Sequence, residues 1–81
     1  MQSNQIFQYR AVPVPVDPNW LELVGQLVKR RNKLKISQEA LAFKIGCANS
    51  LIGKWERYER LPSGYMLLYW LQALDCKIKI K

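Results

Sequence analysis

The sequence predicts a mainly α-helical fold, in which four helices form a compact domain between an extended N-terminal arm and a short C-terminal β-strand. Three observations support this prediction. Apolar residues recur at helical spacing in four stretches between residues 18 and 75. The apolar fraction of 49% is ordinary for a globular fold and too high for a disordered chain. A length of 81 residues leaves room for one core only.

The N-terminal arm is predicted over residues 1–17. Pro13 and Pro15 each fix their own φ and push the preceding valine toward an extended conformation, so we expect residues 6–16 to be extended. A strand over residues 7–12 and an ordered tail lying on the core both fit this pattern.

The first helix begins at Asp17-Pro18, because Asp caps exposed N–H groups and Pro fits the first helical position. We expect it to run to about residue 32. Its end carries a dense basic patch, which also suits the negative end of the helix dipole. The patch comprises Lys29, Arg30, Arg31, Lys33 and Lys35.

Two short helices follow. Ser37 caps a helix over 38–45, and Gly46 ends it as a left-handed residue. After the turn at residues 47–48, a third helix runs from 49 to about 57, with Ile52 and Trp55 facing inward. Two short helices joined by a tight turn that contains Gly are typical of a helix-turn-helix.

The fourth helix is predicted over 64–74, after the start signal Pro62-Ser63. Its apolar stripe at helical spacing consists of Leu67, Trp70, Leu71 and Leu74. Three further apolar side chains then lie on faces that water should reach, which indicates an interface. These are Met66, Leu68 and Tyr69.

Residues 76–81 alternate apolar and charged side chains, which predicts a short strand. A single strand must pair. It pairs either with residues 7–12 of the same chain or with its own copy across a two-fold axis. The second alternative predicts a homodimer, in which Ile78 and Ile80 join the apolar residues of the fourth helix. Otherwise the N-terminal arm covers those residues and the protein is a monomer.

The charge balance points to a polyanionic partner. Lys and Arg number 13 and Asp and Glu number 6, so the formal net charge is +7, and nucleic acid is the first candidate. The chain lacks His, its acids are scattered, and it has no glycine-rich phosphate loop, so we expect no enzyme. Cys47 and Cys76 lack metal-ligand spacing, so we expect no metal and no cofactor.

No membrane association is expected. The apolar run over 66–71 is far shorter than the ~20 residues that cross a bilayer, and no signal peptide is evident. These features predict a cytoplasmic protein, which associates with the nucleoid when it is bound to nucleic acid.

Three segments together resemble a known family. They are SQEALAFKIG at 37–46, IGKWE at 52–56 and RLPS at 60–63. They are similar to the phage repressor and Cro-like helix-turn-helix family, also called the xenobiotic-response-element type, over residues 23–74. The resemblance implies a transcriptional regulator that binds double-stranded DNA, usually as a dimer on palindromic operators. Antitoxins of toxin–antitoxin pairs share this domain.

The helix over 49–57 is then the recognition helix. With Ile52 and Trp55 inward, its outward residues are Asn49, Ser50, Gly53, Lys54 and Arg57. We expect base contacts from Asn49, Ser50 and Lys54, since Asn pairs with adenine and Lys with guanine. Gly53 either lets the helix lie close to the groove floor or is simply tolerated.

The resemblance also implies contacts to the DNA backbone and one structural pair. Gln38 matches a residue that touches a phosphate and braces the recognition helix. Arg31 and Glu56 match a partly buried salt bridge, and Arg31 also faces the backbone. The loop after the recognition helix adds the phosphate contacts Arg57, Tyr58 and Arg60.

Five positions depart from the family pattern. Ala48 replaces a capping Ser or Thr, so one of the two following residues is expected to cap instead. Leu51 replaces a small polar residue and either meets a thymine methyl group or packs locally. Tyr58 replaces a common Gly, so the end of the third helix should differ. Asp75 replaces the usual Gly after the fourth helix. Phe43 occupies a usually polar site.

We therefore predict a sequence-specific transcriptional regulator, a repressor that binds a palindromic operator as a homodimer. The domain boundaries are 1–17 for the arm, 18–75 for the helix-turn-helix and 76–81 for the strand and dimerisation segment. The alternatives are an antitoxin, which would also bind a toxin, and a protein-interaction module on the same fold.

Overall fold

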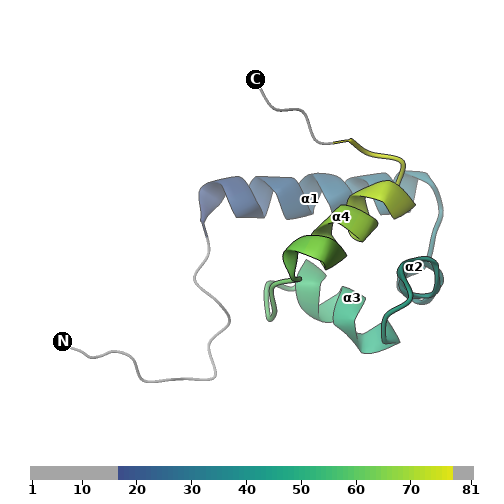
Figure 1. Ribbon diagram of the computed structural model, residues 1–81. Helices are drawn as coiled ribbons and strands as arrows, with labels where there is room; N and C mark the ends of the chain where they lie inside the picture. Colours follow the sequence, from purple (N-terminus) through teal and green to yellow (C-terminus); the bar gives the residue numbers. More distant parts are fainter. Residues whose placement is uncertain (1–16, 78–81) are drawn as a thin grey trace.

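The structure is a computed structural model that describes residues 17–77 and contains four helices (Figure 1). They are α1 (Pro18–Lys33), α2 (Gln38–Ile45), α3 (Asn49–Glu56) and α4 (Gly64–Ala73). The predicted mainly α fold with four helices is confirmed. The arm over residues 1–16 and the end of the predicted strand, with Ile78 and Ile80, lie outside the described residues. Residues 76 and 77, the described part of that strand, are irregular.

Three of the helices begin at the predicted capping residues. Asp17 Oδ1 accepts the Asn19 N–H at 2.7 Å. Ser37 Oγ accepts the N–H of Ala40 at 2.9 Å, and Ser63 Oγ accepts that of Met66 at 3.1 Å. Each bond satisfies an N–H group that has no partner inside its helix.

Helix α3 begins differently. Its N-cap is Ala48, whose side chain forms no capping hydrogen bond. The sequence predicted that Asn49 or Ser50 would cap the helix instead. Neither side chain forms a hydrogen bond with any residue in the described part of the chain, so this prediction is wrong. Both side chains are exposed at the start of the helix.

The end of every helix is marked by a residue in the left-handed conformation. After α2 this is Gly46, with φ of 87°. After the others it is Lys35 at 59°, Tyr58 at 62° and Asp75 at 61°. Tyr58 thus adopts a conformation that favours glycine. The expectation that it changes the end of α3 is wrong for the backbone, which makes the usual left-handed turn.

The turn after α3 is closed by two backbone hydrogen bonds. The Tyr58 N–H donates to the Trp55 carbonyl at 3.2 Å, and the Glu59 N–H donates to the Lys54 carbonyl at 2.8 Å. This pair of bonds is the Schellman arrangement. The turns after α1 and α4 have the same pattern of bonds.

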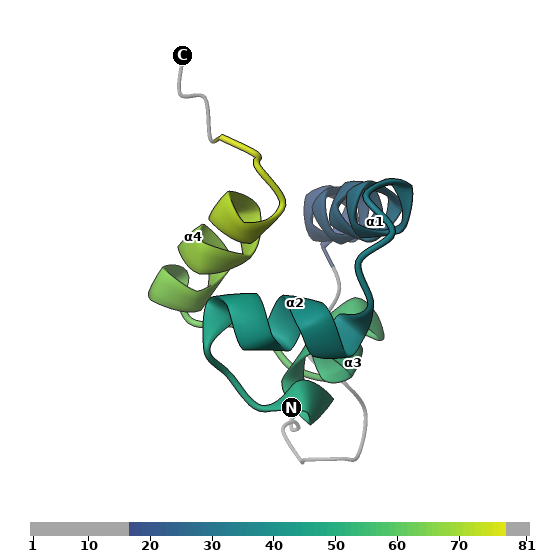
Figure 2. The same cartoon turned by 90° about the vertical axis from the view of Figure 1, so that its right-hand side faces the viewer.

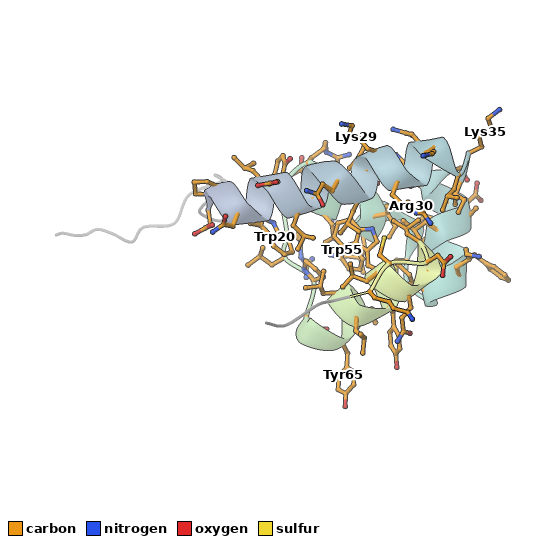
Figure 3. All side chains as sticks on the ribbon, turned by 90° about the horizontal axis from the view of Figure 1, so that it is seen from above. Trp20, Lys29, Arg30, Lys35, Trp55 and Tyr65 are labelled. Carbon is orange, nitrogen blue, oxygen red and sulfur yellow. The ribbon has the colours of Figure 1, made fainter. Side chains whose placement is uncertain are left out.

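One core joins the four helices. Trp55 of α3 and Trp70 of α4 lie at its centre, with ring centroids 5.2 Å apart. Figure 3 shows Trp20 and Trp55 directed into the domain. The buried residues are Val24, Leu27, Leu41, Ala42, Ile52, Trp55, Trp70, Leu71 and Leu74. Because each helix contributes to this set, the core fixes the position of α3.

Helices α2 and α3 lie together beside α1 (Figure 2). Helix α2 contacts both α3 and α4, and α1 contacts α3. Arg30 of α1 also donates from Nε to the carbonyl of Leu74 at 2.9 Å, which ties α1 to the end of α4. Within residues 17–77, no helix has the length and apolar character needed to cross a membrane.

Candidate nucleic-acid interface

A nearly buried carboxylate, that of Glu56, joins α3 to the two helices before it. Arg31 of α1 donates to Glu56 from Nε to Oε2 at 2.7 Å and from Nη2 to Oε1 at 3.0 Å. Gln38 of α2 donates from Nε2 to Oε1 of the same carboxylate at 2.9 Å. The side chains of Arg31 and Glu56 are only 12% and 7% exposed. The pair implied by the resemblance is therefore present and nearly buried.

The Arg31 guanidinium has few free hydrogen-bond donors for a partner outside the protein. Its third nitrogen, Nη1, donates to the carbonyl of Ile36 at 2.9 Å. All three nitrogens therefore have acceptors within the domain, and the side chain closes the loop between α1 and α2. The contact that Arg31 was expected to make with the DNA backbone stays a prediction, and the geometry favours its structural role.

The expected base-contacting residues share the outer surface of α3. Asn49 and Ser50 are exposed at its first turn, and Lys54 is half-buried one turn later. Leu51 is also half-buried and packs against the core. Of its two interpretations, this packing favours the local role over contact with a thymine methyl group.

Gly53 was expected to face outward, but it is buried. Two long side chains lie over it. A Cβ atom at Gly53 would lie 2.9 Å from Arg57 Nη1 and 3.4 Å from Gln38 Oε1. The absence of a side chain at residue 53 gives the Arg57 guanidinium a place directly against α3.

The loop after α3 positions the expected phosphate contacts. Arg57 is exposed and donates to Glu59 from Nε at 2.8 Å and from Nη2 at 3.2 Å. This hydrogen bond raises the pKa of the Arg57 guanidinium and lowers that of the Glu59 carboxyl group. Tyr58 is half-buried against the core, and Arg60 is exposed.

Glu59 was not singled out from the sequence. The available signal was an acidic residue two positions after a basic one, beyond the end of α3.

The basic patch at the end of α1 divides into two groups. Arg30 and Arg31 turn inward to Leu74 and Glu56, whereas Lys29, Lys33 and Lys35 are exposed. Figure 3 shows Lys29 on the outer side of α1 and Lys35 beyond its end. Three of the five charges are therefore presented to solvent.

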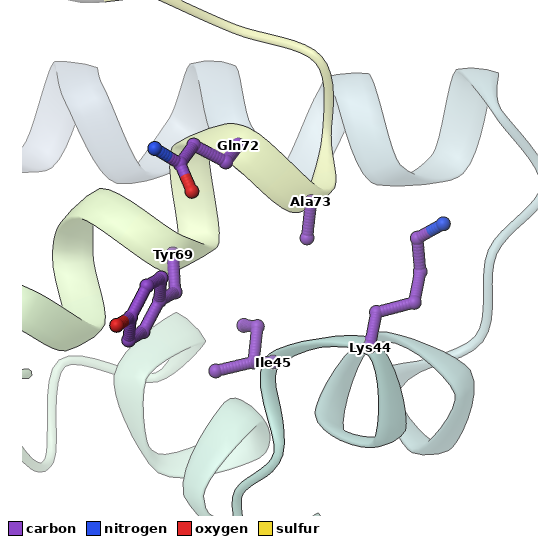
Figure 4. Close-up of a pocket in the computed structure, with 5 residues that line it drawn as sticks. All are labelled: Lys44, Ile45, Tyr69, Gln72 and Ala73. Carbon is purple, nitrogen blue, oxygen red and sulfur yellow. The ribbon is translucent and has the colours of Figure 1, made fainter.

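The expected interface on α4 is smaller than predicted. Met66 is half-buried and packs against the core, so it is not left on a wet face. Leu68 and Tyr69 are 39% and 43% exposed, and Tyr65 is 75% exposed with its ring 6.4 Å from that of Tyr69. We call Tyr65, Leu68 and Tyr69 the α4 patch. Beside it, α4 and the end of α2 line a pocket of about 430 Å³ (Figure 4).

No metal centre was found in residues 17–77, where no three Cys, Asp or Glu side chains gather closely enough to hold an ion.

These elements define a helix-turn-helix domain, in which α2 and α3 are the two helices of the motif and the outer surface of α3 is exposed. Residues 27–80 match the helix-turn-helix family. The chain belongs to this family in its phage-repressor-like form, as its motifs predicted.

One relative is a phage repressor. The chain is 45% identical over 56 residues to Repressor protein C2 of Salmonella phage P22. The matched region covers 68% of this chain and 26% of that protein, so the chain spans about a quarter of the relative's length. No solved structure matches the chain.

Proposed function

We propose that this chain binds duplex DNA in a sequence-specific manner and regulates transcription as a repressor. The observation that carries the proposal is the set of hydrogen bonds that Glu56 accepts from Arg31 and Gln38. These hydrogen bonds tie α3 to α1 and α2, while Asn49, Ser50 and Lys54 lie on the outer surface of the helix. A recognition helix needs this arrangement, because base edges are read only by side chains held in a fixed position.

The roles follow from position. Asn49, Ser50 and Lys54 contact base edges in the major groove. Arg57 and Arg60 contact phosphates from the loop after α3, and Tyr58 supports that loop. Gln38 braces α3 and borders the phosphate contacts. The net charge of +7 and the similarity to Repressor protein C2 support a DNA partner over a protein one.

We further propose that two copies bind a palindromic operator. The α4 patch exposes two tyrosines and a leucine on one helix, and apolar surface of this kind favours association. Two-fold pairing would place two α3 helices about 34 Å apart, which matches successive major grooves. The comparisons give no support to the toxin-binding alternative.

The test is selection of bound sequences from random duplex DNA, followed by titration across salt concentrations. We expect a recovered consensus with two-fold symmetry. If about five phosphates per protomer are neutralised, log K should fall with log salt at a slope near −4 to −5 for each protomer bound, and at about twice that slope when two copies bind one operator. The matched control is a chain with Asn49→Ala and Lys54→Ala, which should lose the consensus and keep the salt dependence. Equal affinity of the natural chain for every sequence would overturn specificity, and no salt slope would overturn DNA binding.

A further inference from the structure

The loop after α3 places a carboxylate directly beside the expected phosphate contact. Tyr58 adopts the left-handed conformation, and the Glu59 N–H donates to the Lys54 carbonyl at 2.8 Å. These features fold the loop back on the end of α3 and fix the start of the Glu59 side chain. Its carboxylate then accepts two hydrogen bonds from Arg57, at 2.8 and 3.2 Å.

The Arg57 guanidinium is occupied on two sides. Nε and Nη2 both donate to Glu59, and this pair of donors is one of the forks by which Arg binds phosphate. The remaining nitrogen, Nη1, lies against Gly53, where an added Cβ would come within 2.9 Å of it. A phosphate therefore meets a guanidinium whose side-on donors already have an anionic partner.

Glu59 also lies near a second cation of the proposed interface, Lys54. The positive charge of Lys54 contributes to the lowered pKa of its carboxyl group, after the larger effect of the hydrogen bond from Arg57. An anion at this position offsets positive charge where DNA phosphates are expected to approach, whichever bases the operator contains.

We infer that Glu59 is an internal counter-anion of Arg57, which a DNA phosphate must displace, so that Glu59 limits affinity for all duplexes alike. The inference rests on the proposed function. Glu59 then weakens the general attraction to DNA and leaves the base contacts of α3 unchanged. Such a balance matters because non-specific binding is largely electrostatic, whereas base contacts supply discrimination.

The experiment compares the natural chain with Glu59→Gln on the selected operator and on an unrelated duplex. Gln keeps the size of the side chain and removes its charge. We expect affinity to rise by the same factor on both duplexes, about two- to fivefold, as for an exposed ion pair. The slope of log K against log salt should change by less than ~0.9 per protomer, because Arg57 contacts a phosphate in both complexes and only the neighbouring anion is lost. Both residues are exposed, so the melting temperature should stay within error.

Two controls separate this effect from others. Glu22→Gln removes one negative charge on α1, where Glu22 accepts a hydrogen bond from Gln26 at 3.2 Å, and it should change affinity less. In an Arg57→Ala background, Glu59→Gln should have a much smaller effect, since the donor that Glu59 competes for is gone. An equal gain from Glu22→Gln, or a gain that is undiminished without Arg57, would overturn the inference.

The direction of the change in affinity distinguishes the counter-anion role from the opposite one, in which Glu59 helps Arg57 to bind DNA. If Glu59→Gln lowers affinity, the carboxylate holds Arg57 in a productive position, and the counter-anion is ruled out. If the natural chain binds its operator and Glu59→Gln leaves affinity and slope unchanged, the inference fails alone. If the natural chain binds no duplex, the proposed function fails and this inference with it.

Discussion

The Arg31 guanidinium binds both oxygens of the Glu56 carboxylate, with Nε 2.7 Å from Oε2 and Nη2 3.0 Å from Oε1. The two residues are 25 positions apart and belong to α1 and to the last turn of α3. Charge-assisted bidentate bonds of this kind fix orientation as well as distance. Because Gln38 donates to the same carboxylate, a single acidic side chain links α3 to both α1 and α2.

Loss of Arg31 should therefore destabilise the domain. Arg31→Ala leaves the nearly buried Glu56 carboxylate without its cationic partner, and removal of one partner from a fully buried pair costs about 3–5 kcal/mol. We expect a clear fall in melting temperature, measured by circular dichroism. Lys29→Ala is the matched control, because Lys29 is an exposed cation on the same helix, and its effect should stay within about 0.5 kcal/mol. Equal melting curves for the two variants would contradict a buried role for the pair.

Lys35 offers the opposite test, a gain in stability. Its φ of 59° places a side chain in the left-handed conformation, which costs roughly 1–2 kcal/mol for residues other than Gly. Lys35→Gly should raise the free energy of unfolding by up to about 1 kcal/mol, since Gly also loses more backbone entropy. A rise of a few degrees in melting temperature is the expected readout.

The control at the same position is Lys35→Ala, which removes the same charge and keeps Cβ. It should show no gain. If both variants melt at the same temperature, charge or solvation explains the result and the backbone conformation does not.

The surface of α3 should separate base contacts from phosphate contacts. We expect Asn49→Ala and Lys54→Ala each to reduce discrimination at particular base pairs, by roughly 1–3 kcal/mol. Arg57→Ala should weaken binding to all sequences alike. The measurement is a matrix of variants against operators with single base changes. A uniform loss for Lys54→Ala would make Lys54 a phosphate contact instead.

Much of the fold could be predicted because its determinants are local. Asp17, Ser37 and Ser63 cap helices through hydrogen bonds to residues two or three positions away. Gly46 ends α2 because a left-handed residue is needed there. The spacing of Ile52 and Trp55 identified the inner face of α3, and both are buried. Such signals are contained in a few consecutive residues.

The parts that could not be predicted depend on long side chains and on neighbouring elements. Gly53 looked exposed by helical spacing, but Arg57 and Gln38 lie over it. Met66 looked left over on α4, but the core extends far enough to cover it in part. Tyr58 shows no sequence signal for a left-handed turn. Its conformation is held by hydrogen bonds to the end of α3 and by packing of its side chain against the core.

The proposed dimer can be tested through the α4 patch. Leu68 is 39% exposed between two exposed tyrosines, so a charge there would be buried in any interface built on this patch. Leu68→Glu should therefore give a monomer, because an unpaired charge is strongly unfavourable at an apolar contact. We expect sedimentation at micromolar concentration to show the natural chain at twice 9.5 kDa and Leu68→Glu at 9.5 kDa, with equal helix content.

Phe43→Glu is the control for this dimer test, because Phe43 is 87% exposed on α2 and lies outside the α4 patch. The same apolar-to-charged change at that site should leave the dimer intact, so a loss of association specific to Leu68→Glu would locate the interface. Loss of the dimer in both variants would place the interface elsewhere or across both helices. A natural chain that sediments only at 9.5 kDa and binds one half-site without cooperativity would contradict the dimer itself. Two-fold spacing of α3 would then not come from this chain alone, and the recovered consensus should lack a palindrome.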